Sequence, residues 1–167
     1  MKILSERLTM TQITKKHWSL FHTLHTDPLV ISLCFDELST FEIEDKFNSR
    51  LKPWSSDSDD WLCLVVIDNE TNESVGITGF CIKNKTAEVG FMFLPQYHGK
   101  GYATESLTAL LAYSKSKLNI KNYNAIVTEG NIGSEKVLIK SGFSLKMKTP
   151  EAYKIGDTLY ADHIYHH

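Results

Sequence analysis

A short segment between a strand-like run and a strongly periodic run carries two glycines two positions apart. Its sequence is Gln96-Tyr97-His98-Gly99-Lys100-Gly101-Tyr102-Ala103-Thr104. Glycine lets the backbone turn sharply and approach a ligand closely, and the free N–H groups and positive dipole of a helix start favour an anion. The segment therefore predicts a pyrophosphate cradle. The alternative is a tight strand-to-helix turn that needs glycine for its backbone angles alone.

Two other phosphate-binding loops fit this segment poorly. A Walker loop needs Gly-Lys-Ser/Thr after a four-residue gap from an earlier glycine, whereas Lys100 is followed by Gly101. A Rossmann fingerprint needs a third glycine where Thr104 stands and an acidic residue at the end of the next strand, and Glu129 comes late for that position. Neither nucleotide-binding class explains the segment.

The elements that must position the cradle alternate between strand-like and helix-like patterns. Apolar residues at helical spacing make one buried stripe from 100 to 118, the clearest helix of the chain. Ser39 and Glu42 form a capping-box pattern for a helix that ends near Leu51, whereas the residues after Pro28 are expected to form a loop. Strands are expected near residues 1–10, 61–67, 75–80, 87–93, 123–128, 143–147 and 158–165, and helices near 15–26, 40–51, 100–118 and 133–140.

This order of elements, β-αα-βββ-α-β-α-ββ, predicts one mixed α/β domain that spans residues 1–167. A length near the typical domain size, with 42% apolar and 11% aromatic residues, suffices for one packed core. The acidic run from 55 to 60 is too short to separate two domains, and we find no internal repeat.

Charge and cysteine content exclude several classes of function. The chain has 18 Lys and Arg against 20 Asp and Glu, a net charge of −2, so no basic field favours nucleic acid. Cys34, Cys63 and Cys81 form no paired motif, and the N-terminus becomes charged before an apolar segment can form. These features favour a cytoplasmic protein without a membrane segment. The three histidines between residues 17 and 25 lack metal-ligand spacing, so no metal site is expected.

Two motifs in order carry a resemblance to a known family. Gln-x-x-Gly-x-Gly followed by Tyr-Ala-Thr-Glu resembles the acetyl-CoA motif of the GNAT family of N-acetyltransferases. Downstream, the segment from Asn131 to Ser134 and the closing Gly142-Phe143 resemble that family's Asn-x-x-Ala/Ser helix and its Gly-Phe end. The resemblance implies the GNAT fold, a central, mostly antiparallel, twisted sheet of about seven strands flanked by about four helices.

Within that family, two branches compete. Tyr-Ala-Thr-Glu, Ser134 and the closing Asp162-His163 are most similar to the ribosomal-protein N-terminal acetyltransferases. The polyamine acetyltransferases are the alternative, because Phe35-Asp36-Glu37 resembles their acidic loop. That second branch commonly has a tyrosine seven residues after the motif asparagine, where this chain has Leu138. The implied acceptor is accordingly a peptide α-amine or a polyamine.

The resemblance also implies a mechanism in which the amine attacks the thioester of acetyl-CoA directly, without a covalent enzyme intermediate. The backbone of one strand would bind the pantetheine arm and polarise the thioester carbonyl, and the glycine segment would bind the pyrophosphate. The residues that the resemblance places at acetyl-CoA are Phe91, Met92, Phe93, Gln96, His98, Gly99, Lys100, Gly101, Tyr102, Ala103, Thr104 and Asn131.

Three residues are candidates for proton transfer. Glu88 shares strand parity with Gly90 and Met92, so its carboxylate points to one face near the expected thioester and is the first candidate base. Ser134, or a water, is the candidate donor to the departing thiolate. Glu105 is the second candidate base, although it lies opposite the apolar stripe of its helix, which favours a structural role.

Several interpretations of the acceptor amine are compatible with the sequence. A peptide α-amine with a pKa near 8 is substantially neutral at pH 7.5, whereas an aliphatic amine near 10.4 costs about 4 kcal/mol to deprotonate. The acidic stretch from Asp36 to Asp45 would attract a cationic peptide or a polyamine. A non-catalytic acyl-CoA sensor is the alternative from another functional class, and both a monomer and a homodimer are compatible with the sequence.

Overall fold

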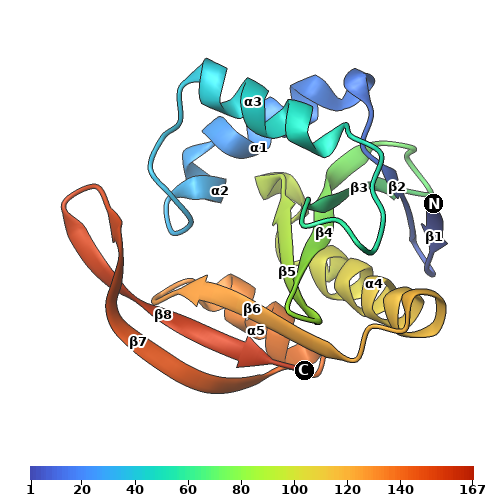
Figure 1. The fold of residues 1–167 in the computed structure, drawn as a ribbon. Helices are drawn as coiled ribbons and strands as arrows, with labels where there is room; N and C mark the ends of the chain where they lie inside the picture. The colour runs from blue at the N-terminus through green and yellow to red at the C-terminus, as the bar shows by residue number, and fades with distance from the viewer.

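The computed structural model describes residues 1–167 and contains one eight-stranded sheet (Figure 1). The strands are β1 (Lys2–Leu4), β2 (Leu8–Gln12), β3 (Leu62–Asp68), β4 (Ser74–Lys83), β5 (Thr86–Phe93), β6 (Asn122–Thr128), β7 (Ser144–Ile155) and β8 (Thr158–His166). Their order across the sheet is β1-β2-β3-β4-β5-β6-β8-β7. All neighbours are antiparallel except β5 and β6, which run parallel.

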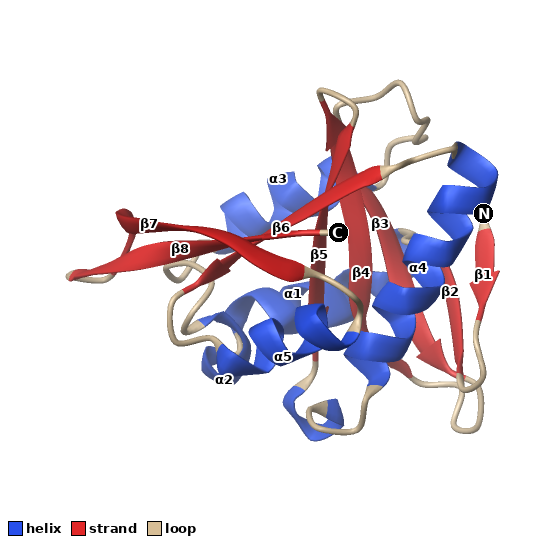
Figure 2. Cartoon of the chain, turned by 90° about the horizontal axis from the view of Figure 1, so that it is seen from below, coloured by secondary structure: helices blue, strands red, loops and turns tan.

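Helices cover both faces of this sheet (Figure 2). They are α1 (Trp18–Thr26), α2 (Pro28–Ile31), α3 (Thr40–Arg50), α4 (Tyr102–Leu118) and α5 (Ile132–Lys140), with 3-10 turns at Lys15–His17 and Pro95–Tyr97. None of these helices has both the length and the apolar character needed to cross a bilayer. The expected mixed α/β class is confirmed, with eight strands and five helices where the sequence indicates about seven and about four.

Two of these differences arise from local chemistry in the first third of the chain. The expected first strand is a hairpin, because Ser5 and Leu8 close a turn through a 3.0 Å N–H to carbonyl bond between β1 and β2. The expected loop after Pro28 begins instead with the short helix α2. Asp27 caps that helix through the Leu29 N–H at 2.9 Å, and proline is favourable at a first helical position because it lacks the N–H that would go unpaired.

The strand β7 is much longer than the expected segment from 143 to 147. Nearly all of its residues are exposed, and it pairs with β8 as far as Ile155. An exposed strand has no alternation of buried and exposed side chains, so its hydrophobic pattern stops before the strand does. Pro150 lies at an irregularity in the β7–β8 pairing, between Thr149 and Tyr153, where no ladder hydrogen bond from its nitrogen is needed.

Apolar side chains form two clusters, one on each face of the sheet. The larger one, with 21 buried residues, joins α4 and α5 to the sheet through residues such as Leu107 and Leu138. The smaller one, with eight buried residues, joins α1 and α3 to the other face through Phe21 and Phe47. Strand β5 contributes to both clusters because its side chains alternate, with Val89 in the larger and Met92 against the smaller.

The two parallel strands in the middle of the sheet separate after a short contact. Only three residue pairs join them, from Thr86 with Asn122 to Glu88 with Asn124. Beyond Glu88 the two strands diverge, and Figure 1 shows β5 and β6 leading away from each other. This divergence opens the sheet between the two helical layers and creates the cleft described next.

Candidate active site

The glycine segment forms a tight loop that ends as α4 begins. Gly99 and Gly101 have φ angles of 74° and 81°, in the left-handed region that favours glycine. Gly101 is the N-cap of α4. None of the six amide groups from Gly99 to Thr104 donates to another backbone group of the protein. The chain therefore presents a row of free N–H donors at a helix N-terminus, which suits a pyrophosphate.

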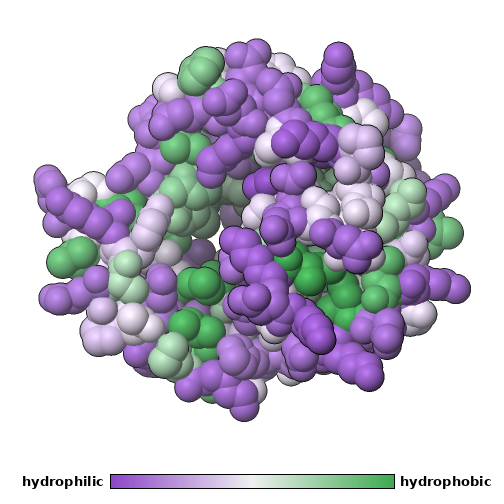
Figure 3. Space-filling model, viewed as in Figure 1, coloured by the Kyte–Doolittle hydropathy of each residue, from purple (hydrophilic) through white to green (hydrophobic).

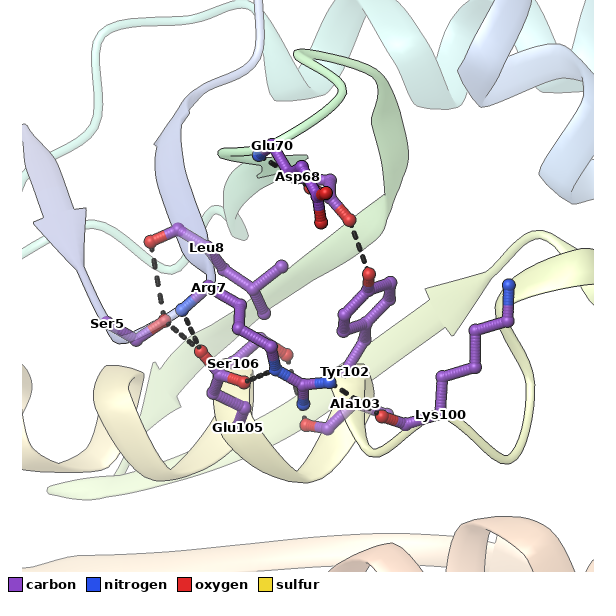
Figure 4. Close-up of polar contacts among 10 residues, drawn as sticks. All are labelled: Ser5, Arg7, Leu8, Asp68, Glu70, Lys100, Tyr102, Ala103, Glu105 and Ser106. Carbon is purple, nitrogen blue, oxygen red and sulfur yellow. Dashed lines mark hydrogen bonds and ion pairs between the residues drawn. The ribbon is translucent and has the colours of Figure 1, made fainter.

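This loop is fastened from outside by Arg7, which follows the first strand (Figure 4). Its Nη1 donates to the Lys100 carbonyl at 3.0 Å, and its Nε pairs with the Glu105 carboxylate at 2.7 Å. The Ser5 hydroxyl and the Arg7 amide each donate to the same carboxylate at 2.7 Å. The cradle is thus held in shape before any ligand arrives.

Glu105 is occupied by these contacts. Burial alone would raise the pKa of Glu105, but the hydrogen bonds from Arg7 and Ser5 together lower that pKa below its usual value. The carboxylate faces the β1–β2 turn, and Glu105 does not line the cleft between β5 and β6. This placement favours the structural role and separates Glu105 from the other two proton-transfer candidates.

Tyr102 is also fixed by side-chain contacts. Its hydroxyl donates to Asp68 at the end of β3, and the Arg7 guanidinium lies 4.7 Å from the centre of its ring. Asp68 further accepts the N–H groups of Glu70 and Thr71 at 2.8 and 3.2 Å. Because of the Tyr102 hydrogen bond above all, the pKa of Asp68 is lowered. Only the backbone amide of Tyr102 remains for the cradle.

The open edge of β5 presents backbone groups of alternate residues. The Leu94 N–H donates to Val75 on β4 at 3.1 Å, so residues of even number on β5 point their backbone groups toward β4. The backbone groups of Phe91 and Phe93 consequently point away from β4 toward the cleft, whereas those of Met92 point toward β4, although all three residues are candidates for contact with the pantetheine arm. The Nε2 atom of His98 forms a hydrogen bond with the Phe93 carbonyl at 2.8 Å. The His98 side chain therefore anchors the glycine loop to β5.

A cavity of about 170 Å³ lies where β5 and β6 diverge. Figure 3 shows this side of the molecule hollowed between the upper helices and the lower strands, with apolar surface in the hollow. Val89, Gly90 and Phe91 line it from β5, and Asn131 and Ser134 line it from α5. The remaining lining residues are Leu33, Cys34, Ala125, Ile126, Val127, Thr128 and Leu138. The lining contains no carboxylate and no imidazole.

Asn131 and Ser134 are brought together at the start of α5. Asn131 Oδ1 accepts the Ser134 N–H at 3.2 Å, which makes Asn131 the helix cap and leaves its NH₂ group for a ligand. The helix is further fixed by Glu135, whose carboxylate binds His163 at 2.5 Å and the Tyr165 hydroxyl at 3.0 Å. Both motif residues therefore reach the cavity from a rigid element.

Glu88 lies at the apex of the cleft, as the last residue of β5 that pairs with β6. Its side chain is half-buried and shares the α1–α3 face with Gly90 and Met92, as strand parity predicts. It stands opposite Cys81 of β4 and does not line the cavity. Any proton transfer by Glu88 would therefore pass through water.

The loop between α2 and α3 contains the acidic segment that the sequence indicated and two lining residues, Leu33 and Cys34, that it did not. Leu33 and Cys34 close the first cavity, and a second cavity of about 320 Å³ lies beside this loop. The second cavity is lined by Phe35, Asp36 and Glu37 and by the tip of the β7–β8 hairpin. No periodicity marks an irregular loop, so only the fold reveals that it reaches the cleft.

Among curated proteins, this chain is similar to three N-acetyltransferases of Bacillus subtilis whose functions are uncharacterised. It is 25% identical to YnaD over 85% of this chain and 82% of that protein. It is 31% identical to YoaA over 44% of each chain and 31% identical to YjdG over 56% of this chain. The chain therefore spans about half the length of these last two relatives, 44% of YoaA and 55% of YjdG.

Solved structures show the same fold over the whole chain. A GNAT-family acetyltransferase from Bacillus anthracis superposes with a TM-score of 0.84 at 25% identity, over 100% of this chain and 98% of that one. A spermidine N-acetyltransferase from Vibrio cholerae, in complex with CoA and spermine, gives 0.83 at 21% identity over 98% and 96%. An acetyltransferase of a ribosomal protein's N-terminal serine, from Salmonella typhimurium, gives 0.82 at 18% over 100% and 98%.

The superposition over the whole chain confirms the expected GNAT fold. The family model described as the acetyltransferase (GNAT) domain matches residues 7–144. Enzymes of this fold use acetyl-CoA, and the free amide row fits its pyrophosphate. The chain belongs to the GNAT family of N-acetyltransferases.

Proposed function

We propose that this enzyme transfers the acetyl group of acetyl-CoA to the α-amine at the N-terminus of a peptide or protein. One observation carries the choice of acceptor: no carboxylate or imidazole lines the cavity where the strands diverge. An α-amine near pKa 8 needs little help to lose its proton at pH 7.5, whereas an aliphatic amine near 10.4 costs about 4 kcal/mol. A site in which no side chain can take the proton directly therefore suits a peptide α-amine better than an aliphatic amine.

In the proposed reaction, the amine nitrogen forms a bond to the thioester carbonyl carbon and the carbon–sulfur bond breaks. The amides from Gly99 to Thr104 hold the pyrophosphate, and the β5 backbone at Phe91 orients the thioester. The proton lost by the amine passes to water near Glu88. Ser134, whose side chain lies on the cavity wall, gives a proton to the departing thiolate and regains one from solvent.

The test is release of free CoA thiol from acetyl-CoA with a panel of peptides that have free N-termini. We expect kcat/KM to rise with pH up to about 8, as the α-amine loses its proton. Replacement of Ser134 by Ala should lower kcat about tenfold while the KM for acetyl-CoA stays the same, because water is a poorer proton donor there. Tight CoA binding with no thiol release from any amine would instead identify a sensor.

A second acceptor class has an observation of its own. The carboxylates of Asp36 and Glu37 line the second cavity beside the cleft, and two anions attract a polyamine. Spermidine in the same thiol-release assay separates the classes. A polyamine acetyltransferase would give a higher kcat/KM with spermidine than with every peptide, with activity still rising above pH 9.

A further inference from the structure

The helix α3 carries two cations one turn apart, each of which lies over an aromatic ring. Lys46 Nζ lies 5.3 Å from the centre of the Phe35 ring, and the Arg50 guanidinium lies 5.4 Å from the ring of Trp61. Residues four apart lie on one face of a helix, so both charges point the same way. Arg50 is half-buried in this position.

Neither cation has an anionic partner in the protein. The three ion pairs of the chain involve Arg7, Lys154 and His163, and the one side-chain hydrogen bond of Arg50 goes to Ser49 at 3.4 Å. Burial lowers the pKa of Arg50 and of Lys46, and for Lys46 the charge of Arg50 adds to this lowering. A guanidinium has five N–H donors and is costly to desolvate unpaired. This pair is therefore suited to an anion from outside.

Glu42, one turn before Lys46 on α3, favours the charge of Lys46 but is engaged in the helix cap. Glu42 binds the Ser39 amide and hydroxyl at 2.8 and 2.7 Å in the cap of α3. Asp60 is near enough to favour the Arg50 charge but forms no ion pair with it. Neither cation therefore forms an ion pair with an acid of the protein.

The position of the pair connects it to the cleft. A Cβ placed on Gly90 would lie 3.2 Å from the Trp61 ring, so the indole covers the backbone of β5 at a residue that also lines the cavity. Phe35 directly follows Cys34, another lining residue. Arg50 is thus separated from a lining residue by the Trp61 ring, and Lys46 lies over the ring that follows a lining residue in the sequence.

We infer that Arg50 and Lys46 bind a carboxylate carried by the acceptor, so that the preferred substrate is an amine with an acidic group close to the reacting nitrogen. This inference rests on the proposed acetyl transfer to an amine. Arg50 stacks on Trp61 while its edge donates to the carboxylate, a geometry that guanidinium groups adopt readily. The same two charges repel a polyamine.

Matched acceptors test the inference. The peptide Ser-Asp-Ala-Ala is compared with Ser-Asn-Ala-Ala, the α-amide of aspartate with the α-amide of asparagine, and spermidine serves as the cation. For the unmodified enzyme we expect kcat/KM about tenfold higher for the acidic member of the preferred pair, mainly through KM. The peptide and amino-acid pairs distinguish the two sources of the carboxylate.

Variants then assign the preference to the two cations. In Arg50→Gln the ratio of acidic to neutral kcat/KM should fall to about one, and in Lys46→Gln it should fall about threefold. Arg50→Lys keeps the charge and should retain part of the ratio. Lys52→Gln, an exposed lysine just beyond α3, is the matched control and should retain all of it. Thermal unfolding of each variant establishes that it is folded.

Two outcomes overturn the inference: a ratio near one in the unmodified enzyme, or an unchanged ratio in Arg50→Gln. If no amine releases thiol, the proposed function fails, and calorimetric titration of the two peptides in the presence of CoA still tests the carboxylate site. Equal affinities for the Asp and Asn peptides would then overturn it.

Discussion

Charged side chains are paired on one side of the cleft and unpaired on the other. On the cradle side, Arg7 is paired with Glu105 and the hydrogen-bond donors left free are backbone amides. On the side that we propose receives the acceptor, formed by α3 and the loop between α2 and α3, Lys46 and Arg50 have no anionic partner. Backbone donors suit the pyrophosphate of acetyl-CoA, the proposed acetyl donor. Unpaired side chains suit an acceptor that differs between members, so the second side is where specificity should reside.

The largest expected effect is the pH dependence of the stability of the fold, which arises from His25 beside α3. His25 is buried between Phe21 and Phe35, with its Nδ1 at 2.8 Å from the Phe21 carbonyl. Burial lowers the pKa of His25 to about 4, and the charges of Lys46 and Arg50 add to this lowering. The unfolded chain, with an ordinary pKa near 6.5, binds the proton first, so stability falls as pH drops from about 6.5 to 4.

A shift of this size corresponds to about 3 kcal/mol of unfolding free energy lost across that window. Urea unfolding at pH 7, 5.5 and 4.5 measures the loss. His25→Leu should be less stable at pH 7 but should lack this part of the pH dependence. The same slope in both proteins between pH 6.5 and 4.5 would show that another group titrates there.

The second effect concerns the cradle side. Glu105→Ala removes three hydrogen bonds to a carboxylate and leaves Arg7 without its partner, so we expect a loss of about 2 kcal/mol. Because the folded pKa of Glu105 is lowered, its contribution is present above about pH 4.3 and is lost as pH falls further. The KM for acetyl-CoA should rise in this variant, while kcat at saturating acetyl-CoA should stay within twofold. A large fall in kcat alone would restore Glu105 as a base.

The sequence predicted the glycine turn and the helix after it better than the contacts around α3, and the reason is physical. Gly99, Gly101 and the periodic helix are local signals, since backbone angles and helical spacing are set by neighbours in the chain. The contact of Arg7 with Lys100 joins residues far apart, and the exposure of β7 removed its hydrophobic pattern. The position of Arg50 over Trp61, and of Trp61 over Gly90, depends on packing between elements, which a single sequence does not indicate.

A third, smaller effect tests whether the cradle needs glycine for its angles or for its contacts. A Cβ on Gly101 would lie 3.3 Å from Arg7 Nη2, at a φ of 81°. Gly101→Ala should weaken CoA binding about tenfold, since left-handed strain costs about 1 kcal/mol and the fastened loop must shift. Gly156→Ala, at a φ of 56° with open space around it, is the control for strain alone. Equal effects of the two variants on CoA affinity would remove the cradle interpretation.

The smallest effect concerns the bridge between the acceptor-side loop and the β7–β8 hairpin. Asp36 Oδ1 accepts the Gly156 N–H at 2.6 Å, joining segments 120 positions apart beside the second cavity. An exposed hydrogen bond contributes about 1 kcal/mol or less, so Asp36→Ala should raise the KM for a peptide acceptor about threefold. The KM for acetyl-CoA should not change.

Asp36→Asn separates the bridge from the charge. The amide oxygen of asparagine can still accept the Gly156 N–H, so a positioning role of the loop leaves this variant near the unmodified enzyme. If Asp36 instead attracts a cationic acceptor, removal of its charge should weaken binding in Asp36→Asn as much as in Asp36→Ala. Because the unpaired cations of α3 predict an acidic acceptor, we expect Asp36→Asn to behave like the unmodified enzyme. Weakened binding in Asp36→Asn would instead indicate that the acidic loop, and not Arg50, recognises the acceptor.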